Sequence, residues 1–510
     1  MRAQRLRAFL CLACSVAIAG CASLAARFQA PSGAPPPSAG TLQTDCVTAA
    51  VVGLSWNTAD HARNVRYEIS RDGKLLGTTS DTQFVDTTVA ESHHYTYTVG
   101  ATLPSGEKAT SATTEINTPA TSPTGDAPYC PSQQIGAMNW DWSSAITEPN
   151  GSDLWPVTWG RDGKVYTFFG DGGGFGGDNR RGRASFGIAS ITGPPPPTSA
   201  SVRNVYGGYN ALHPSAVAGK AGALIAVGSD FYTLGGVYAP TELHDDPNRV
   251  SRSPKRLQLA YSKGNAHSWK AAPWIFCSAT EGRFCPNGFI NYGRGNAGAL
   301  DGQVYLLGFA NSAASWGANA GAIPDSAATY LARVPRKHLL DLQAYRYFAG
   351  VDARGQPIWS PDQHQMQPIF VDGNRSQAGC GGRCIMAGAL EEVAYNTTLK
   401  RYIGVAQGNY VSQTSFYDAP QPWGPWTTIS YNNIDAATGA GGWANLGTTG
   451  GEGLGVHLVN AWTSRDGLTL WFTYSSDGKA PQNASFPPAG TMLDSFNLVS
   501  VRLIPGPATR

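Results

Sequence analysis

One pattern recurs along the second part of the chain and limits the folds open to it. A tight turn leads into an apolar strand, and a further strand follows. The copies are "DGKVYTFFGD" (from 162), "AGALIAVGSD" (from 221), "DGQVYLLGFA" (from 301), "LKRYIGVAQG" (from 399) and "DGLTLWFTYS" (from 466). Five such units predict a five-bladed β-propeller over residues 128–505, because small antiparallel sheets can repeat around a channel. A jelly roll or a pair of sandwiches would not repeat in this way.

The composition fits an all-β protein. Only 14% of the 510 residues are charged, whereas the chain holds 61 Gly, 14 Trp and 21 Tyr. Many turns and aromatic surfaces give such a mixture. The length exceeds one ordinary core, so more than one domain is expected. A net charge of +2 gives no electrostatic reason for a nucleic-acid partner.

The N-terminus has the pattern of an export signal. Three arginines within the first seven residues precede a short apolar run, which ends in "IAGC" at Cys21. This motif resembles the lipobox of bacterial lipoproteins. The resemblance implies a signal peptide over 1–20, acylation of Cys21 and, from Ala22 after it, sorting to the outer membrane. Residues 21–40 would then be a Pro- and Ser-rich tether, on the periplasmic face or the cell surface.

Residues 41–118 contain short alternating runs separated by turn signals, which predict a small β-sandwich. Trp56, the hairpin "YEISRDGKLLG" and the run "YTYTV" from Tyr95 resemble the strand B tryptophan, the C to C′ turn and the tyrosine corner of fibronectin type III modules. The resemblance implies a spacer or an accessory binding module without catalysis.

Six cysteines follow Cys21, and in an exported protein they favour disulfides over metal ligands. Their spacing favours three bonds, although six cysteines allow other pairings: Cys46–Cys130, Cys277–Cys285 and Cys380–Cys384.

The stretch "GSDLWPVTWGRDGKVYTFFGDGGGFGG" predicts a pair of acids. A three-residue hairpin loop at 161–163 would pair Gly160 with Lys164, and counting outward places Asp153 opposite Asp171. Two carboxylates at one site can act as the acid and the base or nucleophile of glycosidic bond cleavage. The alternative is ordinary Asp-Gly turn chemistry.

Polar residues before the other turns are expected to ring the mouth of the channel and to bind a polar substrate. These substrate-binding candidates are His213, Arg294, Asn296, Glu391, Glu452 and His457. Because side chains alternate along a strand, only one of Glu391 and Glu392 should face the channel, and we select Glu392 as a third catalytic carboxylate. For each of these residues the alternative is exposure on a loop.

Three tryptophans near the acids, Trp142, Trp155 and Trp159, could stack on sugar rings, with core packing as the alternative. The chain has no Gly-Lys phosphate loop, no Ser-His-Asp motif context and no His-rich metal spacing, so we expect neither a cofactor nor a metal. Neither His244-Asp245-Asp246 nor Asp178 belongs to a calcium-ligand pattern that we recognise, and the sequence leaves open whether a structural Ca²⁺ ion is bound. We expect a monomer.

The propeller segment also resembles the bacterial family called domain of unknown function 4185. The matching stretches are "DLWPVTWGRDGKVYTFFGDGGGF", "FINYGRGNAGALDGQVYLLG", "EEVAYNTTLKRYIGVAQGNY" and "YDAPQPWGPWTTI". Some members are similar to endo-D-arabinanases of glycoside hydrolase family 183, which implies D-arabinan cleavage with Asp153 and Asp171 as the paired aspartates. The sequence leaves open which aspartate is the acid and whether cleavage retains or inverts. The alternative function is a cell-surface lectin that binds glycans without cutting them.

Overall fold

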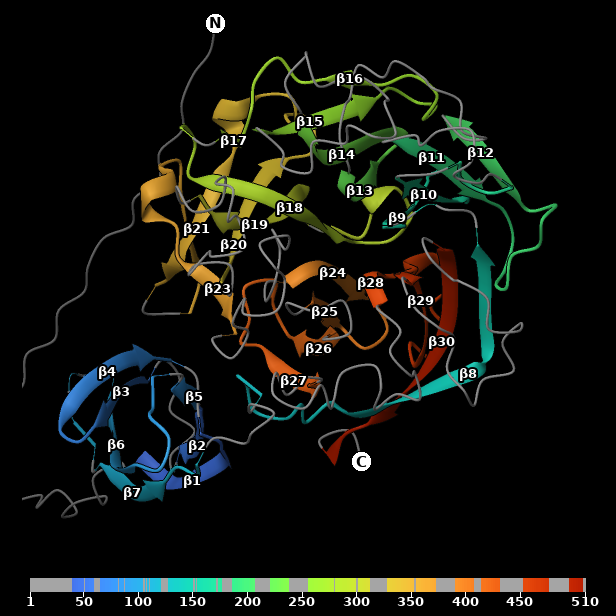
Figure 1. The fold of residues 1–510 in the computed structure, drawn as a ribbon. Helices are drawn as coiled ribbons and strands as arrows, with labels where there is room; N and C mark the ends of the chain where they lie inside the picture. Colours follow the sequence, from blue (N-terminus) through green and yellow to red (C-terminus); the bar gives the residue numbers. More distant parts are fainter. Residues whose placement is uncertain are drawn as a thin grey trace, which may run out of the picture.

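A computed structural model shows an all-β protein, which confirms the fold class predicted from the sequence (Figure 1). It describes residues 39–49, 51–58, 65–80, 82–86, 88–103, 106, 108–109, 111–120, 127–149, 152, 154–170, 173–176, 186–206, 221–237, 256–278, 280–299, 301–311, 328–352, 355–372, 390–407, 414–431, 453–476 and 495–507. Within these ranges no helix has the length and apolar character needed to cross a membrane. The signal peptide, Cys21 and nearly all of the tether fall outside them.

The first seven strands form two sheets with the arrangement of a fibronectin type III sandwich. One sheet contains β1 (Ala39–Val47), β2 (Val52–Thr58) and β5 (Gln83–Asp86), and the other contains β4 (Lys74–Thr79), β3 (Arg66–Arg71), β6 (His94–Thr102) and β7 (Ala112–Asn117). Side chains along β6 alternate between buried and less buried positions, as expected for a strand with one face on a core. Trp56 packs edge-on against Tyr67 in that core. The hydroxyl of Tyr95 accepts a hydrogen bond from the amide of Ala90 at 2.7 Å, which is the tyrosine corner.

The remaining strands form antiparallel groups arranged around a centre (Figure 1). We call these groups blades. Blade 1 contains β9 (Val157–Trp159), β10 (Val165–Phe169), β11 (Gly187–Ile191) and β12 (Val202–Tyr206); blade 2 contains β13 (Ala221–Val227), β14 (Asp230–Val237), β15 (Arg256–Ser262) and the short β16 (Lys270–Ala271) and β17 (Cys277–Ser278). Blade 3 contains β18 (Phe284–Asn291), β19 (Gln303–Ala310), β20 (Ala328–Pro335), β21 (Arg346–Val351), β22 (Pro357–Ser360) and β23 (Pro368–Val371).

Blade 4 contains β24 (Leu390–Asn396), β25 (Arg401–Gln407), β26 (Thr414–Ala419) and β27 (Thr427–Ser430); blade 5 contains β28 (Gly453–Leu458), β29 (Thr469–Ser476), β30 (Ser495–Pro505) and β8 (Ile135–Pro149). The first strand of each blade lies innermost. Along the ring, β13 contacts β9 and β18, and β24 contacts β18 and β28. Blades 3 and 4 are joined directly, because β18 and β24 pair in parallel at Ile290 and Val393.

Blade 5 closes the ring with strands from both ends of the propeller segment. β8 comes first in that segment and pairs with β30, which comes last (Figure 1). The pairing runs from Ile135 opposite Pro505 to Pro149 opposite Ser495. Pairing of this kind holds the two ends of the propeller segment together within one blade.

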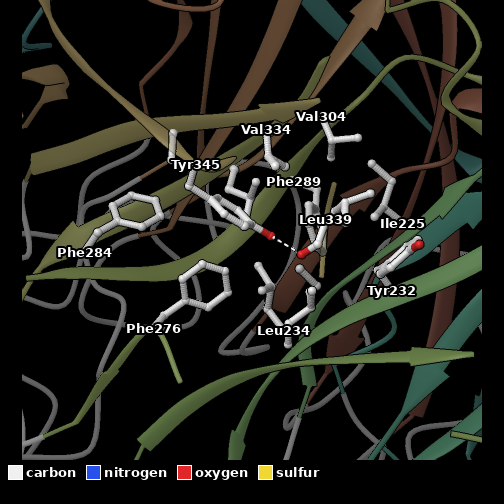
Figure 2. Close-up of a cluster of buried hydrophobic side chains, with 14 of the residues drawn as sticks. Ile225, Tyr232, Leu234, Phe276, Phe284, Phe289, Val304, Val334, Leu339 and Tyr345 are labelled. Carbon is white, nitrogen blue, oxygen red and sulfur yellow. Dashed lines mark hydrogen bonds between the residues drawn. The ribbon is translucent and has the colours of Figure 1, made fainter. Parts of the chain in front are cut away.

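Apolar side chains fill the space between neighbouring blades. Figure 2 shows the cluster between blades 2 and 3, in which Ile225, Tyr232 and Leu234 face residues such as Phe284 and Val304. The buried hydroxyl of Tyr345 donates to the carbonyl oxygen of Leu339 at 2.8 Å. The polar end of this tyrosine is therefore satisfied within an otherwise apolar interface.

Two of the favoured disulfides are present. Cys46 is bonded to Cys130 and ties the sandwich to the start of the propeller segment, and Cys277 is bonded to Cys285 in blades 2 and 3. The third pair, Cys380 and Cys384, lies outside the described residues.

Candidate functional site

A cavity lies where the five innermost strands meet. The empty space there is about 270 Å³ when space open to solvent is included, and every inner strand supplies part of its wall. The lining residues are Pro156 and Val157 at β9, Ala223 and Leu224 on β13, Phe289 and Asn291 on β18, Glu391 and Glu392 on β24, and His457 on β28. The wall is thus apolar on one part and carries two carboxyl groups, an imidazole and an amide on the rest.

The inner strands are irregular beside this cavity. Register shifts occur between Ala221 and Ala223 in β13, Pro286 and Gly288 in β18, Leu390 and Glu392 in β24, and Leu454 and His457 in β28. In the chain before β9, Leu154 and Trp155 have φ values of 79° and 50°. Bulges re-aim side chains and are frequent next to active sites. Register shifts also occur in outer strands such as β26 and β30, so here they explain how side chains are aimed at the cavity and do not by themselves identify a site.

The bulge in β24 changes the expectation for Glu391 and Glu392. Strict alternation would let only one of them face the channel, whereas both line the cavity. The expectation was wrong because Glu391 is the extra residue of the bulge, between the paired residues Leu390 and Glu392. Glu391 is half-buried, and Glu392 is 8% exposed.

Glu392 is bound to His457 across the boundary between blades 4 and 5. Its Oε2 lies 2.5 Å from Nδ1 of His457, and its Oε1 accepts a hydrogen bond from the amide of Leu458 at 2.9 Å. Both side chains are buried, with His457 4% exposed. A buried carboxylate needs such partners, because desolvation without them is costly. Sequence reasoning selected both residues separately and did not pair them.

The hairpin that carries the predicted aspartates has the expected register near its turn. The amide of Gly160 donates to the carbonyl oxygen of Lys164 at 2.9 Å, and Gly163 has a φ of 92°. Val165 lies opposite Trp159, as the count predicted. The register continues to the hydrogen bond from the Phe168 amide to the Pro156 carbonyl oxygen at 3.0 Å.

Beyond that bond the strand does not continue, because Leu154 and Trp155 have left-handed backbone conformations. The prediction assumed regular strand pairing as far as the two acids. That assumption fails between Pro156 and Leu154. Asp153 and Asp171 themselves lie outside the described residues, so their opposition remains a prediction.

The tryptophans are not arranged as a sugar platform. Trp155 is fully buried, and its Nε1 donates to the carbonyl oxygens of Ser152 and Ser495, so it belongs to the core. Trp142 stacks on Trp140 in β8, the outermost strand of blade 5. The sugar-stacking role was wrong for Trp155, and Trp142 is on the wrong strand for the channel.

Trp159 is half-buried at the turn end of β9 and is not among the cavity-lining residues of the described chain. Two further candidates also lie at that end. Arg294 is exposed and donates from Nε to the carbonyl oxygen of Arg161 at 2.9 Å. Asn296 is buried, and its Oδ1 accepts from the amide of Tyr292.

The placement of Arg294 and Asn296 at the mouth was wrong because a 3-10 helix, Arg294–Asn296, follows β18 before the turn. Residues counted back from the turn therefore fall in this helix and do not reach the inner strand β18. The remaining candidates, His213 and Glu452, lie outside the described residues.

Sequence reasoning missed Asn291, which lines the cavity and is 5% exposed. Its Oδ1 accepts from the amide of Gly293 at 3.0 Å. A polar residue at the end of the apolar run "GFIN" was the available signal. Among the described residues no group of three or more His, Cys, Asp or Glu side chains converges as a metal site would.

The fold and the cavity define a class: an all-β protein with a fibronectin type III sandwich and a propeller that has ionisable residues at its centre. No family model matches the chain. A curated relative, an alpha-amylase from Niallia circulans, is 42% identical over 81 residues, which are 16% of this chain and only 6% of that protein.

Two solved structures align with parts of the chain. A GH43_1 enzyme from Xanthomonas citri aligns over 71% of this chain and 90% of its own, with 13% identity and a TM-score of 0.37. The fibronectin type III domain of human fibronectin type III domain containing protein 3 aligns over 18% of this chain and 94% of its own, with 16% identity and a TM-score of 0.16.

Proposed function

We propose that the protein is a glycoside hydrolase that cleaves a polysaccharide at the central cavity of the propeller. The observation that carries the proposal is the cavity wall, in which Glu391, Glu392 and His457 lie beside apolar side chains such as Phe289. Carboxyl and imidazole groups are the usual agents of proton transfer. Apolar side chains can cover the faces of sugar rings while polar groups bind hydroxyls.

Asp153 and Asp171 are proposed as the acid and the base or nucleophile. The hairpin register supports this assignment as far as Pro156 and Phe168. A second support is that Leu154, the residue after Asp153, has its carbonyl oxygen 2.6 Å from the point that a Cβ at Gly455 would occupy. Leu154 therefore lies close to β28, which also carries His457.

The finer proposal is an endo-acting D-arabinanase. Its support is the resemblance of stretches such as "DLWPVTWGRDGKVYTFFGDGGGF" to the propeller family named above. The segment shared with an alpha-amylase adds a link to a carbohydrate-active protein and says nothing about the bond that is cleaved.

The test is to incubate the full chain, in detergent, with D- and L-arabinans, galactans and other envelope polysaccharides and to measure new reducing ends. We expect release from at least one arabinan and a loss of several orders of magnitude in Asp153→Asn and in Asp171→Asn. Near-normal turnover in either variant would remove that aspartate from catalysis. Glycan binding without release across the whole panel would instead identify a lectin.

A further inference from the structure

Glu392 and His457 divide their roles in a way that differs from the sequence expectation. We propose that His457 accepts the proton of the attacking water in the cavity, and that Glu392 is a positioning residue that holds His457. The proposal rests on the hydrolase function above and deepens it. It replaces the expectation that Glu392 itself reaches the substrate.

Both carboxylate oxygens of Glu392 already have hydrogen-bond partners in the cavity wall. One oxygen, Oε2, faces Nδ1 of His457 at 2.5 Å, and the other, Oε1, accepts from the amide of Leu458 at 2.9 Å. Both partners belong to blade 5, and Glu392 is 8% exposed. A carboxylate held through both oxygens is suited to orient a neighbour, as carboxylates do for catalytic histidines.

When Glu392 is ionised, this contact selects one tautomer of His457. An ionised carboxylate can only accept hydrogen bonds, so Nδ1 must carry the hydrogen that it donates to Glu392. In the neutral ring Nε2 is then the acceptor. Nε2 makes no hydrogen bond with a described residue, and it is not among the polar atoms sealed from solvent without a partner. Since His457 lines the cavity, its acceptor nitrogen is available there.

A glycine in an irregular part of β28 lies next to this nitrogen. A register shift in β28 separates Leu454 from His457, and Gly455 has a φ of 62°. A Cβ at Gly455 would lie 3.1 Å from Nε2 of His457 and 2.6 Å from the carbonyl oxygen of Leu154. A side chain at position 455 would therefore crowd the acceptor nitrogen and clash with the backbone of Leu154.

The chemical step balances with groups already proposed. One aspartate of the pair attacks the anomeric carbon while the other protonates the leaving oxygen, and the glycosidic C–O bond breaks. Water then attacks the anomeric carbon of the glycosyl ester, its proton passes to Nε2 of His457, the ester C–O bond breaks to return the carboxylate, and the acid aspartate regains its proton from solvent. The imidazolium that forms lies beside the Glu392 carboxylate, which stabilises its charge, and it later returns the proton to solvent.

Two variants of His457 test which of its ring nitrogens the activity requires. In His457→Asn the side-chain amide can replace Nδ1–H toward Glu392 but leaves nothing at the position of Nε2. His457→Ala removes both nitrogens. We expect kcat on the active polysaccharide to fall by about 10²–10⁴-fold in both variants, with a small change in KM. Added imidazole should restore part of the activity of His457→Ala, which a merely structural role would not allow.

Glu392→Gln tests the positioning role. A glutamine whose oxygen accepts from Leu458 would turn its NH₂ toward Nδ1 and force the hydrogen onto Nε2, so we expect a fall in kcat of about 10–100-fold. His267→Asn is the matched control, because His267 is an exposed histidine whose ring nitrogen contacts the carbonyl oxygen of Val205 away from the cavity.

The outcomes distinguish this proposal from the function on which it rests. A wild-type chain that releases no fragments overturns the hydrolase function. An active wild type with near-normal kcat in folded His457→Asn, or with no rescue of His457→Ala by imidazole, overturns the role of His457 alone. Thermal unfolding measured for each variant shows that a loss of kcat is not a loss of fold.

Discussion

At the scale of the residue, Asp86 shows how a buried carboxylate outside the cavity is stabilised. Asp86 is 3% exposed at the end of β5 in the sandwich. Its Oδ2 accepts from Arg71 Nη1 and from the hydroxyl of Tyr97, each at 2.6 Å, and its Oδ1 accepts from Thr88. Burial alone would raise the pKa of Asp86, but the hydrogen bonds from Tyr97 and Thr88 and the charge of Arg71 lower it below its usual value.

We predict that Asp86→Asn destabilises the sandwich in a pH-dependent way. Because the folded pKa is lowered, the stability from Asp86 is present above the unfolded pKa and is lost as pH falls through the folded pKa. The variant should lose about 2–3 kcal/mol at neutral pH. The difference should shrink below about pH 4. Hydrogen exchange of the β3 and β6 amides measures this; a difference that is constant down to pH 3 would contradict it.

At the scale of the element, the bulge in β24 depends on a close approach from β18. A Cβ at Gly288 would lie 2.3 Å from the carbonyl oxygen of Glu391, closer than real contacts allow. The missing side chain of Gly288 therefore lets the inner strands of blades 3 and 4 pair in parallel while Glu391 lines the cavity. Packed interiors transmit such a clash into backbone shifts.

We predict that Gly288→Ala lowers both stability and activity, because the added methyl group must push β18 away from β24 and displace Glu391. Gly302→Ala is the matched control: Gly302 has a φ of 71° with nothing within 4 Å of its Cβ position. The control should lose only about 1–2 kcal/mol from backbone strain and keep its kcat. Equal effects of the two variants on thermal unfolding and on kcat would show that the approach of the two strands does not shape the site.

The hairpin of β9 and β10 shows which features of an element could be predicted from the sequence. The turn from Gly160 to Lys164 was predictable, because loop length and a glycine at positive φ set the register of a hairpin. The break at Leu154 and Trp155 was not, since positive φ at such residues is unusual and is imposed by tertiary contacts. One such contact is the hydrogen bond from the amide of Leu154 to the hydroxyl of Ser475, far away in the sequence.

The candidate site, too, could be predicted only in part from the sequence. Repeats and alternation predicted an all-β chain and pointed to Glu391, Glu392 and His457. The pairing of Glu392 with His457 joins residues 65 positions apart, and no local pattern encodes which blades become neighbours. The bulge that brings Glu391 to the cavity was equally hidden, because one extra residue in a strand has no fixed sequence signature.

At the scale of the whole molecule, we propose that the chain is tethered to the outer membrane through a lipid on Cys21. The motif "IAGC" is the basis of this proposal. We predict that Cys21→Ser abolishes incorporation of a labelled fatty acid and moves the protein from the membrane fraction to the soluble fraction. Undiminished labelling of the variant would contradict the anchor.

Labelling with oxygen-18 water tests most directly whether the propeller hydrolyses a glycan at its central cavity. The full chain is incubated with the active polysaccharide in water enriched in oxygen-18, and the fragments are analysed by mass spectrometry before exchange of the reducing end. Hydrolysis predicts that each new reducing end carries a single heavy oxygen, and that His457→Asn forms such ends far more slowly. The absence of fragments, or fragments without the heavy oxygen, would contradict the account.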